Sequence, residues 1–316
     1  MKPDTNASPA LHARQLGLTV LALGLVHSAL GWAFTTTLVP AHRVSVLDEA
    51  WRSDDTPLDV LIVGDSHARN AVEPRAFRNG LSLAVGGEHY TKTRARMASL
   101  HQENPRDVGT ILIPLDHVSL SGWKAEQFAP EAVWGQHVNF WALGRERGQW
   151  WTFAPMALKA GAFPYIGEFE SAMQRWAGTR AFQGQASTRR EPPRSLRKTG
   201  VDAARAHLAT HAEPNPFLLA DLERLIDASL ARGTKVVLVS YPMTGGYLRT
   251  AQALGVPHPA TLPDVQRLLS RSNVRHLDHS ADFVGMPHLF WDGDHLNAAG
   301  RKALTTALRQ ELIATR

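Results

Sequence analysis

The sequence predicts an α/β protein built as a three-layer parallel sheet, preceded by one transmembrane helix. From residue 58 onward, short and continuously apolar segments alternate with stretches that have the apolar spacing of amphipathic helices. Before them, residues 16–34 form an apolar segment without a charged side chain. The 316 residues suffice for one large domain or two small ones that fold without disulfides or metals.

Composition excludes several classes of protein. The formal net charge of +5, from 34 Lys and Arg against 29 Asp and Glu, falls short of the dense basic surface of a dedicated nucleic-acid binder. We therefore expect no nucleic-acid partner. The chain is 44% hydrophobic and 20% charged, which excludes wholesale disorder. The absence of Cys excludes a disulfide framework, a thiolate zinc site and a cysteine nucleophile.

The N-terminal apolar segment, residues 16–34, has about the length that a helix needs to cross the core of a bilayer. A buried helix of a soluble domain is the alternative, although such a helix is rarely apolar on every side at the extreme N-terminus. Lys2 and Arg14 precede the segment, which favours a cytoplasmic location for residues 1–15. The bulk of the chain then lies outside, after a linker at 35–57. A cleaved signal peptide stays open, but no clear cleavage site follows the apolar core, so we expect an uncleaved signal anchor.

The predicted α/β domain spans residues 58–316. Five short apolar segments are expected to be its strands: 58–63, 81–85, 110–115, 235–240 and 274–277. Three stretches between or after them have helical spacing: 89–103, 216–232 and 298–313. Hydrophobicity along the strands is continuous rather than alternating, which is typical of a parallel sheet covered on both faces.

An insertion of about a hundred residues, 116–215, separates the third and fourth predicted strands. It holds six of the nine Trp residues: Trp123, Trp134, Trp141, Trp150, Trp151 and Trp176. These form either the core of a small subdomain or a surface for carbohydrate stacking or a membrane interface. The basic, Pro-rich tail at 187–198 is expected to be a mobile surface loop.

The chemistry begins after the first strand, with Gly64, Asp65, Ser66 and His67. Open α/β sheets bind their ligands at the carboxyl ends of the strands, so Ser66 stands where a functional side chain is expected. The residues after it are expected to begin a helix whose N-terminal amides favour a developing oxyanion. Asp65 is interpreted as a turn or cap residue. By itself, this short motif also fits an ordinary helix cap.

A second candidate motif, Asp292 with His295, precedes the last predicted helix. Their spacing puts both on one side of a helical turn, so Asp292 can accept from one imidazole nitrogen while the other faces Ser66. Such a set supplies the nucleophile, base and orienting residue of a hydrolytic triad. Two alternatives remain open: Asp292, Asp294 and His295 as ligands of a hard metal ion, or a plain helix-capping turn.

Together, the Gly-Asp-Ser block after the first strand and the Asp-x-x-His block before the last helix resemble the GDSL/SGNH hydrolase superfamily. The resemblance spans residues 58–313 apart from the insertion. It implies that Ser66 is the nucleophile, His295 the general base and Asp292 the residue that orients His295. It also implies an oxyanion hole formed by the backbone amides of Ser66 and of a Gly after the second strand, for which Gly87 is the match.

The third block of the superfamily departs from the pattern. Where the superfamily usually has Gly-x-Asn-Asp after the third strand, this chain has Pro114, Leu115, Asp116 and His117. No Asn therefore completes the oxyanion hole. Either Asp116 or His117 is a substitute, or a donor comes from the insertion, or activity is reduced.

The His directly after Ser66, the final Asp-x-x-His-Leu-Asn block and the N-terminal anchor look like envelope-associated members that add or remove acyl groups on bacterial polysaccharides. This resemblance implies a single-pass protein of the inner membrane with a periplasmic catalytic domain. It implies an acylated glycan or acyl donor, above all an acetyl ester, as substrate. It also implies polysaccharide-biosynthesis proteins as partners and no cofactor.

Two other hypotheses remain. A non-catalytic glycan-binding component of a polysaccharide assembly or export complex is favoured by the missing Asn and opposed by the intact Ser, Asp and His. A metal-dependent phosphoesterase would need a second ligand cluster. The candidates for such a cluster are interpreted as polar loop residues around the fifth strand: His276, Asp278, His279, Asp282 and His288.

Overall fold

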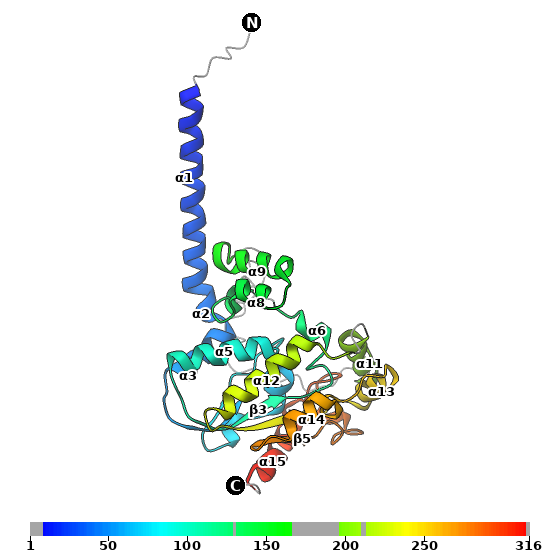
Figure 1. The fold of residues 1–316 in the computed structure, drawn as a ribbon. Helices are drawn as coiled ribbons and strands as arrows, with labels where there is room; N and C mark the ends of the chain where they lie inside the picture. Colours follow the sequence, from blue (N-terminus) through cyan, green and yellow to red (C-terminus); the bar gives the residue numbers. More distant parts are fainter. Residues whose placement is uncertain (1–8, 129–130, 166–195, 210–212, 314–316) are drawn as a thin grey trace. The chain divides into compact units, whose positions relative to one another are not determined.

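Five strands form one parallel sheet in the computed structural model, which describes residues 9–128, 131–165, 196–209 and 213–313 (Figure 1). The strand order is β2-β1-β3-β4-β5. Their bounds are β1 (Leu58–Ile62), β2 (Gly80–Ser82), β3 (Val108–Pro114), β4 (Lys235–Ser240) and β5 (Val274–Asp278). The predicted α/β class and parallel sheet are thus confirmed.

β2 is the strand that differs most from its prediction, which placed it at 81–85. Regular pairing with β1 ends at Ser82. The next residues stay beside β1, since Val85 N–H still donates to Gly64 O at 2.8 Å. Residues 83–85 are buried as expected, but the chain there is already leaving the ladder for the turn that follows.

Helices cover both faces of the sheet, because successive strand residues point to opposite sides. On one side, Leu61 and Ile111 belong to a core cluster with four helices: α3 (Arg43–Arg52), α5 (Tyr90–Glu103), α12 (Pro216–Leu230) and α14 (Pro263–Leu269). On the other, Ile62 and Leu112 pack with α4 (Ser66–Ala71) and α15 (Ala298–Ile313). The three predicted helices appear as α5, α12 and α15. The first two differ at one end by one or two residues.

The region expected as a linker, 35–57, carries α3 and takes part in the core. Trp51 is fully buried, and its indole N–H is 3.2 Å from Leu100 O and 3.1 Å from Asn104 O. Asp48 accepts from Arg96 Nε at 2.6 Å, and both side chains are buried. These contacts hold α3 against α5. The segment is therefore part of the packed domain and not an extended linker.

The chain divides into two compact units. The first comprises Met1–Ser45 and Pro130–Ala177, and the second comprises Val46–Ala129 and Gly178–Arg316. The middle of the predicted insertion therefore belongs with the N-terminal segment. Helices of the first unit are α1 (Pro9–Ala33), α2 (Val39–Ala41), α7 (Glu131–Trp134), α8 (Phe140–Glu146) and α9 (Trp150–Ala162), with a π-helical turn at Phe34–Leu38.

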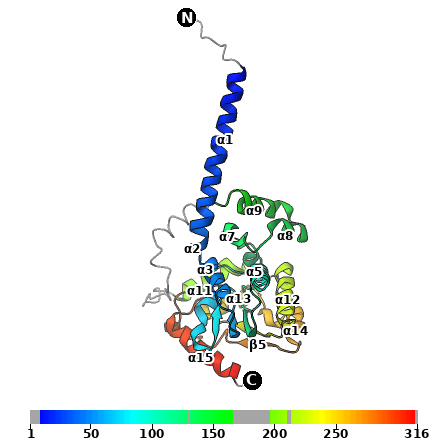
Figure 2. The ribbon, with the colours of Figure 1, turned by 90° about the vertical axis from the view of Figure 1, so that its left-hand side faces the viewer.

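The N-terminal apolar segment forms the long helix α1 (Figure 2). One stretch of the described residues, Ala13–Ala41, is long and apolar enough to cross a membrane, and its most apolar part is not buried against the protein. Leu18, Leu21 and Leu25 are each more than half exposed. By length and composition, this part of the sequence-based prediction is met.

Among the described residues of the insertion, the Trp side chains do not gather in a single core. Trp134 is buried, but Trp141, Trp150 and Trp151 are exposed. Trp176 lies outside the described residues. Three further helices in the described part of the chain belong to the second unit: α6 (Gly122–Ala125), α11 (Leu196–Leu208) and α13 (Gly245–Ala253).

The surface loop predicted at 187–198 is corrected at its end, because residues 196–198 form the first turn of α11. Later in the same helix, Ala204 and Leu208 pack against Met243 and Tyr247. This packing gives the helix an apolar contact that the basic composition of 187–198 did not indicate. Residues 187–195 lie outside the described part of the chain.

Candidate active site

Ser66 is the first residue of α4, directly after the carboxyl end of β1. Gly64 makes the turn with φ +109°, and a Cβ there would stand 2.5 Å from Pro114 Cγ. Asp65 caps the helix, as predicted, because its Oδ1 accepts from His67 N–H at 2.9 Å. The Ser66 N–H is one of the first amides of the helix, which have no intrahelical acceptor. Ser66 is therefore held at a sharp turn on a helix N-terminus.

The structure brings Ser66, His295 and Asp292 together. Ser66 Oγ lies 2.8 Å from His295 Nε2. His295 Nδ1 lies 2.9 Å from Asp292 Oδ1 and 3.0 Å from Asp292 Oδ2. Oxygen, imidazole and carboxylate thus stand in the order of a hydrolytic triad, although Ser66 and His295 are 229 residues apart in the chain.

The turn that carries Asp292 and His295 is fixed by its own hydrogen bonds. Asp292 Oδ1 accepts from Asp294 N–H at 3.1 Å and from His295 N–H at 2.9 Å. Thr244 Oγ1 donates to Gly293 O at 2.5 Å. A side chain at Gly293 would clash, because its Cβ would lie 2.5 Å from backbone atoms of Thr199. The imidazole orientation is therefore set by residues from three separate segments.

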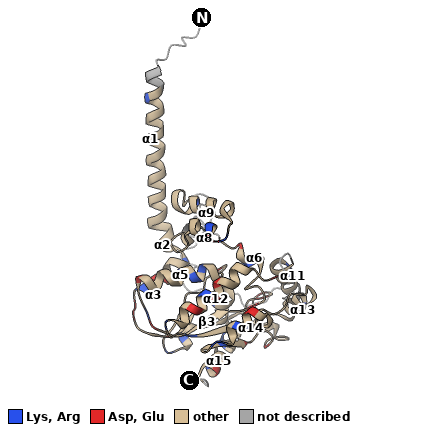
Figure 3. Ribbon diagram, in the orientation of Figure 1, with Lys and Arg blue, Asp and Glu red and all other residues tan. Residues whose placement is uncertain are grey.

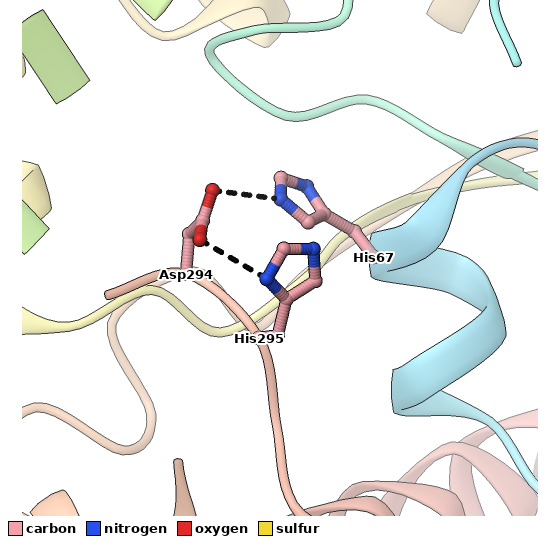
Figure 4. Close-up of side chains that lie close together, drawn as sticks. All are labelled: His67, Asp294 and His295. Carbon is pink, nitrogen blue, oxygen red and sulfur yellow. Dashed lines mark hydrogen bonds and ion pairs between the residues drawn. The ribbon is translucent and has the colours of Figure 1, made fainter. Parts of the chain in front are cut away.

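His295 also touches a second carboxylate, which Figure 4 shows between two imidazoles. Asp294 Oδ1 is 3.1 Å from His295 Nδ1, and Asp294 Oδ2 is 3.3 Å from His67 Nε2. The other ring nitrogen of His67, Nδ1, is 2.9 Å from Asp116 Oδ2. A continuous polar chain therefore runs from Asp116 through His67 and Asp294 to His295 and Ser66.

The charges along this chain follow from its burial and pairing. Burial alone would lower the pKa of His67, but nearby Asp65, Asp116 and Asp294 raise it well above its ordinary value. The His67 ring is therefore a buried cation. Burial would raise the pKa of Asp294, but hydrogen bonds from His295 and His67 hold it well below its usual range. Asp294 is therefore an anion between two imidazoles.

The pKa of His295 is raised to about 9. Burial acts in the opposite direction, but hydrogen bonds to Asp292 and Asp294 outweigh it, while the charge of His67 opposes them. In the resting protein at neutral pH, His295 is therefore mostly protonated. The fraction able to accept a proton from Ser66 grows as the pH rises.

Asp116 and His117, the two residues considered as substitutes for the superfamily Asn, both have other partners. Asp116 Oδ1 accepts from Tyr241 N–H at 2.6 Å, and Oδ2 pairs with His67. Burial raises the pKa of Asp116, and hydrogen bonds from His67 and Tyr241 oppose that shift. Because both of its carboxylate oxygens already have partners, Asp116 supports His67 rather than an oxyanion. The ring of His117 packs edge-on against His258 at 4.9 Å between centroids, and burial lowers its pKa to about 4. No described contact brings His117 to Ser66.

Gly87 lies in the turn after the β2 region with φ +75°. Within the described residues, its N–H makes no hydrogen bond, so it is available as a donor. Beside the same turn lies Arg69 of α4, whose Nη1 is 3.4 Å from the position of a Cβ at Gly86. Arg69 is thus a cation beside Gly86, the residue before the predicted oxyanion donor. It follows Ser66 by three residues and was not singled out from the sequence.

Lys124 and His207 lie near the site but were not singled out from the sequence, because nothing local marks them, and Trp123 of the Trp-rich insertion lies beside them. Lys124 Nζ forms an ion pair with Asp65 Oδ2, and both side chains are buried. His207 Nδ1 lies 3.6 Å from Asp294 Oδ2, and burial lowers the pKa of His207 to about 4. The indole of Trp123 stacks on His207 with 4.2 Å between ring centroids. The place of Lys124 and His207 near the site is evident only from their long-range partners, Asp65 and Asp294.

Two groups of side chains offer metal-ligating atoms within 4.8 Å of one another in the described residues: His67, Asp294 and His295, and His258, His276 and Asp278. In the first group, the facing atoms already pair with one another. In the second, His258 Nδ1 accepts from Ala260 N–H at 3.2 Å, and His276 Nε2 is 2.8 Å from Ser240 Oγ. Internal hydrogen bonds therefore account for the facing atoms of the first group. In the second group they do so only in part, because His258 Nε2 is buried without a hydrogen-bond partner among the described residues. The alternative considered from the sequence was a metal bound by Asp292, Asp294 and His295. In the first group of the structure, His67 takes the place of Asp292.

No protein-family model and no curated protein matches this chain.

Proposed function

We propose that this protein is a membrane-anchored SGNH-type serine ester hydrolase or O-acyltransferase that acts on acetyl or other acyl esters of cell-envelope polysaccharide. The observation that carries the proposal is the contact of Ser66 Oγ with His295 Nε2 at 2.8 Å, backed by Asp292 on the other ring nitrogen. If the Gly-Asp-Ser motif only capped a helix, Ser66 would need no imidazole and carboxylate beside it. The acetyl ester, the glycan and the envelope location come from the resemblance to the superfamily.

In the proposed reaction, Ser66 Oγ attacks the carbonyl carbon of the ester while its proton passes to His295 Nε2. The tetrahedral intermediate collapses, and the proton on His295 goes to the departing alcohol. Water or a sugar hydroxyl then attacks the acyl-Ser66 and gives its proton to His295. The bond between the acyl carbon and Ser66 Oγ breaks, and Ser66 Oγ takes the proton back from His295. The backbone amides of Ser66 and Gly87 are the proposed donors to the oxyanion, with the positive charge of Arg69 nearby.

A non-catalytic glycan-binding role is the second candidate. This role is favoured because the two carboxylate oxygens of Asp116 pair with His67 and Tyr241. No side-chain donor therefore stands at the position where the superfamily has Asn. Against it, the turn that carries His295 is fixed by hydrogen bonds and close backbone packing, as a reacting group requires.

The test uses the full chain in detergent micelles with an activated acetyl ester, with and without an oligosaccharide acceptor. Hydrolysis yields acetate, and transfer yields acetylated oligosaccharide. We expect Trp123→Ala to lower the ratio of acetylated sugar to acetate several-fold, because stacked indoles offer sugar rings an apolar face. The matched control is Trp151→Ala, which removes an exposed indole from the other unit. If wild type yields neither product, the glycan-binding role is the better hypothesis.

The rate of ester hydrolysis should depend on pH through His295. The base must be neutral, and its pKa is raised to about 9, so we expect the rate to rise with pH through that value. Asp292→Asn removes a hydrogen bond that raises this pKa, so the midpoint should move to lower pH while the plateau rate falls about 10²–10⁴-fold. A pH–rate profile of both proteins checks this. A wild-type midpoint near the ordinary value for His would contradict the assignment of His295 as the base.

The proposed topology is one membrane span by α1, with the second unit outside the cytoplasm. A reporter that is active only outside the cytoplasm, fused after Arg316, should therefore be active. The full-length protein should fractionate with membranes and resist extraction by high salt. Recovery of intact protein in the soluble fraction would refute the anchor, and an inactive reporter on a membrane-bound protein would refute the orientation.

A further inference from the structure

The helix α9 exposes an apolar face. Its exposed residues on one side follow one another at intervals of four, three and four positions: Trp151, Pro155, Leu158 and Ala162. Trp151 is 89% exposed and Leu158 is 51% exposed. Lys159 is the one charged residue of the helix. A helix on the surface of a water-soluble domain shows the opposite arrangement, with its polar side outward.

The opposite side of α9 already has its own packing. Phe153 and Ala157 are buried, so the exposed apolar face is additional to the face that stabilises the unit. The apolar surface continues onto α8, because Trp141 and Trp150 pack together with 5.1 Å between ring centroids and are themselves exposed. The whole surface is therefore rich in exposed indoles.

Contacts with α1, which belongs to the same unit, indicate what covers this surface. Directly after α9, Phe163 packs on His27 of α1 with 5.0 Å between ring centroids. Tyr165 hydrogen-bonds through its hydroxyl to His27 Nδ1 and packs with Phe34 and Val39. His27 lies inside Ala13–Ala41, the stretch apolar enough to cross a membrane, and in the C-terminal half of the apolar segment 16–34.

The position of His27 gives an approximate depth. Seven residues separate His27 from Phe34, where the regular α1 helix has ended, and seven residues of helix measure about 10 Å. The C-terminal end of α9 therefore meets α1 inside the apolar segment 16–34, about 10 Å from the C-terminal end of that segment. In the ribbon of Figure 3, the described part of α1 is tan apart from one basic position near its N-terminal end.

We propose that α9 lies in the interface of the membrane, with Trp151, Leu158 and Ala162 toward lipid, as a second membrane contact beside α1. The inference rests on the proposed anchoring by α1. Amphipathic helices at an interface bury their apolar face about 5–10 Å into the boundary of headgroups and acyl chains, which matches the depth of His27. Trp is enriched at that level of the membrane.

The test exploits the absence of Cys, since any introduced Cys is unique. The full chain, carrying Trp151→Cys or Leu158→Cys, is labelled with an environment-sensitive fluorophore and reconstituted in phosphatidylcholine and phosphatidylglycerol vesicles. Leu21→Cys on α1 is the lipid-exposed reference, and Gln136→Cys, exposed on the same unit, is the aqueous reference. Lipids with brominated acyl chains should quench the labels at 151 and 158 about twofold or more above the label at 136.

Each outcome decides the proposal. If labels at 151 and 158 behave like the label at 136 while the label at 21 is quenched by lipid, α1 anchors the protein and the proposal for α9 is wrong. If the label at 21 is also aqueous, the anchor fails as well. Labels on α9 that neither lipid bromine nor aqueous iodide reaches indicate a protein cover, which also overturns the proposal.

A charge variant separates lipid contact from a merely structural effect. Leu158→Glu places a carboxylate on the proposed lipid face and should reduce the lipid quenching of a label at 151 toward the aqueous value. Unchanged quenching would contradict contact of this face with lipid. Ester hydrolysis, measured on the same sample, should not change, so the result does not depend on the proposed activity.

Discussion

Ser66→Ala is expected to reduce ester hydrolysis by several orders of magnitude, because the proposed covalent intermediate forms on Ser66 Oγ. The structure supports this role by the contact of that oxygen with His295 Nε2 at 2.8 Å. The measurement is the initial rate of acetate release by the full chain in detergent. A second readout is mass spectrometry of the protein after a short reaction, in which an acetyl group should be found on Ser66 of the wild type.

The matched control is Ser270→Ala, because Ser270 is an exposed serine at the end of α14 whose hydroxyl donates to Arg267 O. This variant should keep the wild-type rate. Equal rates for wild type and Ser66→Ala would remove the enzymatic hypothesis and favour the glycan-binding role. A lost rate with the acetyl group attached at another residue would instead show that Ser66 is needed but is not the nucleophile.

His67→Ala is expected to destabilise the fold by about 3–5 kcal/mol, because it leaves the buried carboxylates of Asp116 and Asp294 without their shared cation. The measurement is urea unfolding of the full chain in micelles, followed by far-ultraviolet circular dichroism. His101→Ala is the control. His101 is a partly buried imidazole without a carboxylate partner in its described contacts, and burial lowers its pKa.

The loss of folding stability in His67→Ala should become smaller as the pH rises. The pKa of His67 is raised in the folded state above the unfolded value of about 6.5, so the charged ring stabilises the fold fully below about 6.5. This contribution is lost as the pH rises through the raised pKa. The difference in stability between wild type and His67→Ala should therefore shrink in alkaline solution. A variant that unfolds at the wild-type urea concentration near neutral pH would show that this ion pair has no net effect.

Local patterns in the sequence determined the parallel sheet, the apolar α1 and the helices α12 and α15. Continuous hydrophobicity over five or six residues predicts a strand buried on both faces, because burial on each side is encoded in neighbouring residues. The position of Ser66 was predictable for the same reason, since a strand end is a local feature. Asp292 and His295 were predictable as a pair because they are three positions apart in the chain.

Only the tertiary structure decided what surrounds those residues. The ring of His67 joins Asp116 and Asp294, which are 49 and 227 residues away, and Lys124 pairs with Asp65 across 59 residues. The order of strands in the sheet brings such partners together, and no spacing along the chain encodes it. The same reason explains the assignment of Asp116, which the sequence left as a candidate oxyanion donor and the structure places beside His67 and Tyr241.

The division of the chain was likewise a tertiary result. The Trp-rich insertion was visible from composition, but composition does not tell which side chains pack inward and which remain exposed. The structure buries Trp134, leaves Trp151 exposed and groups residues 130–177 with α1 in one unit. Packing of Tyr165 against Phe34 and Val39 joins segments more than a hundred residues apart, and contacts at that distance are set by three-dimensional fit rather than by periodicity.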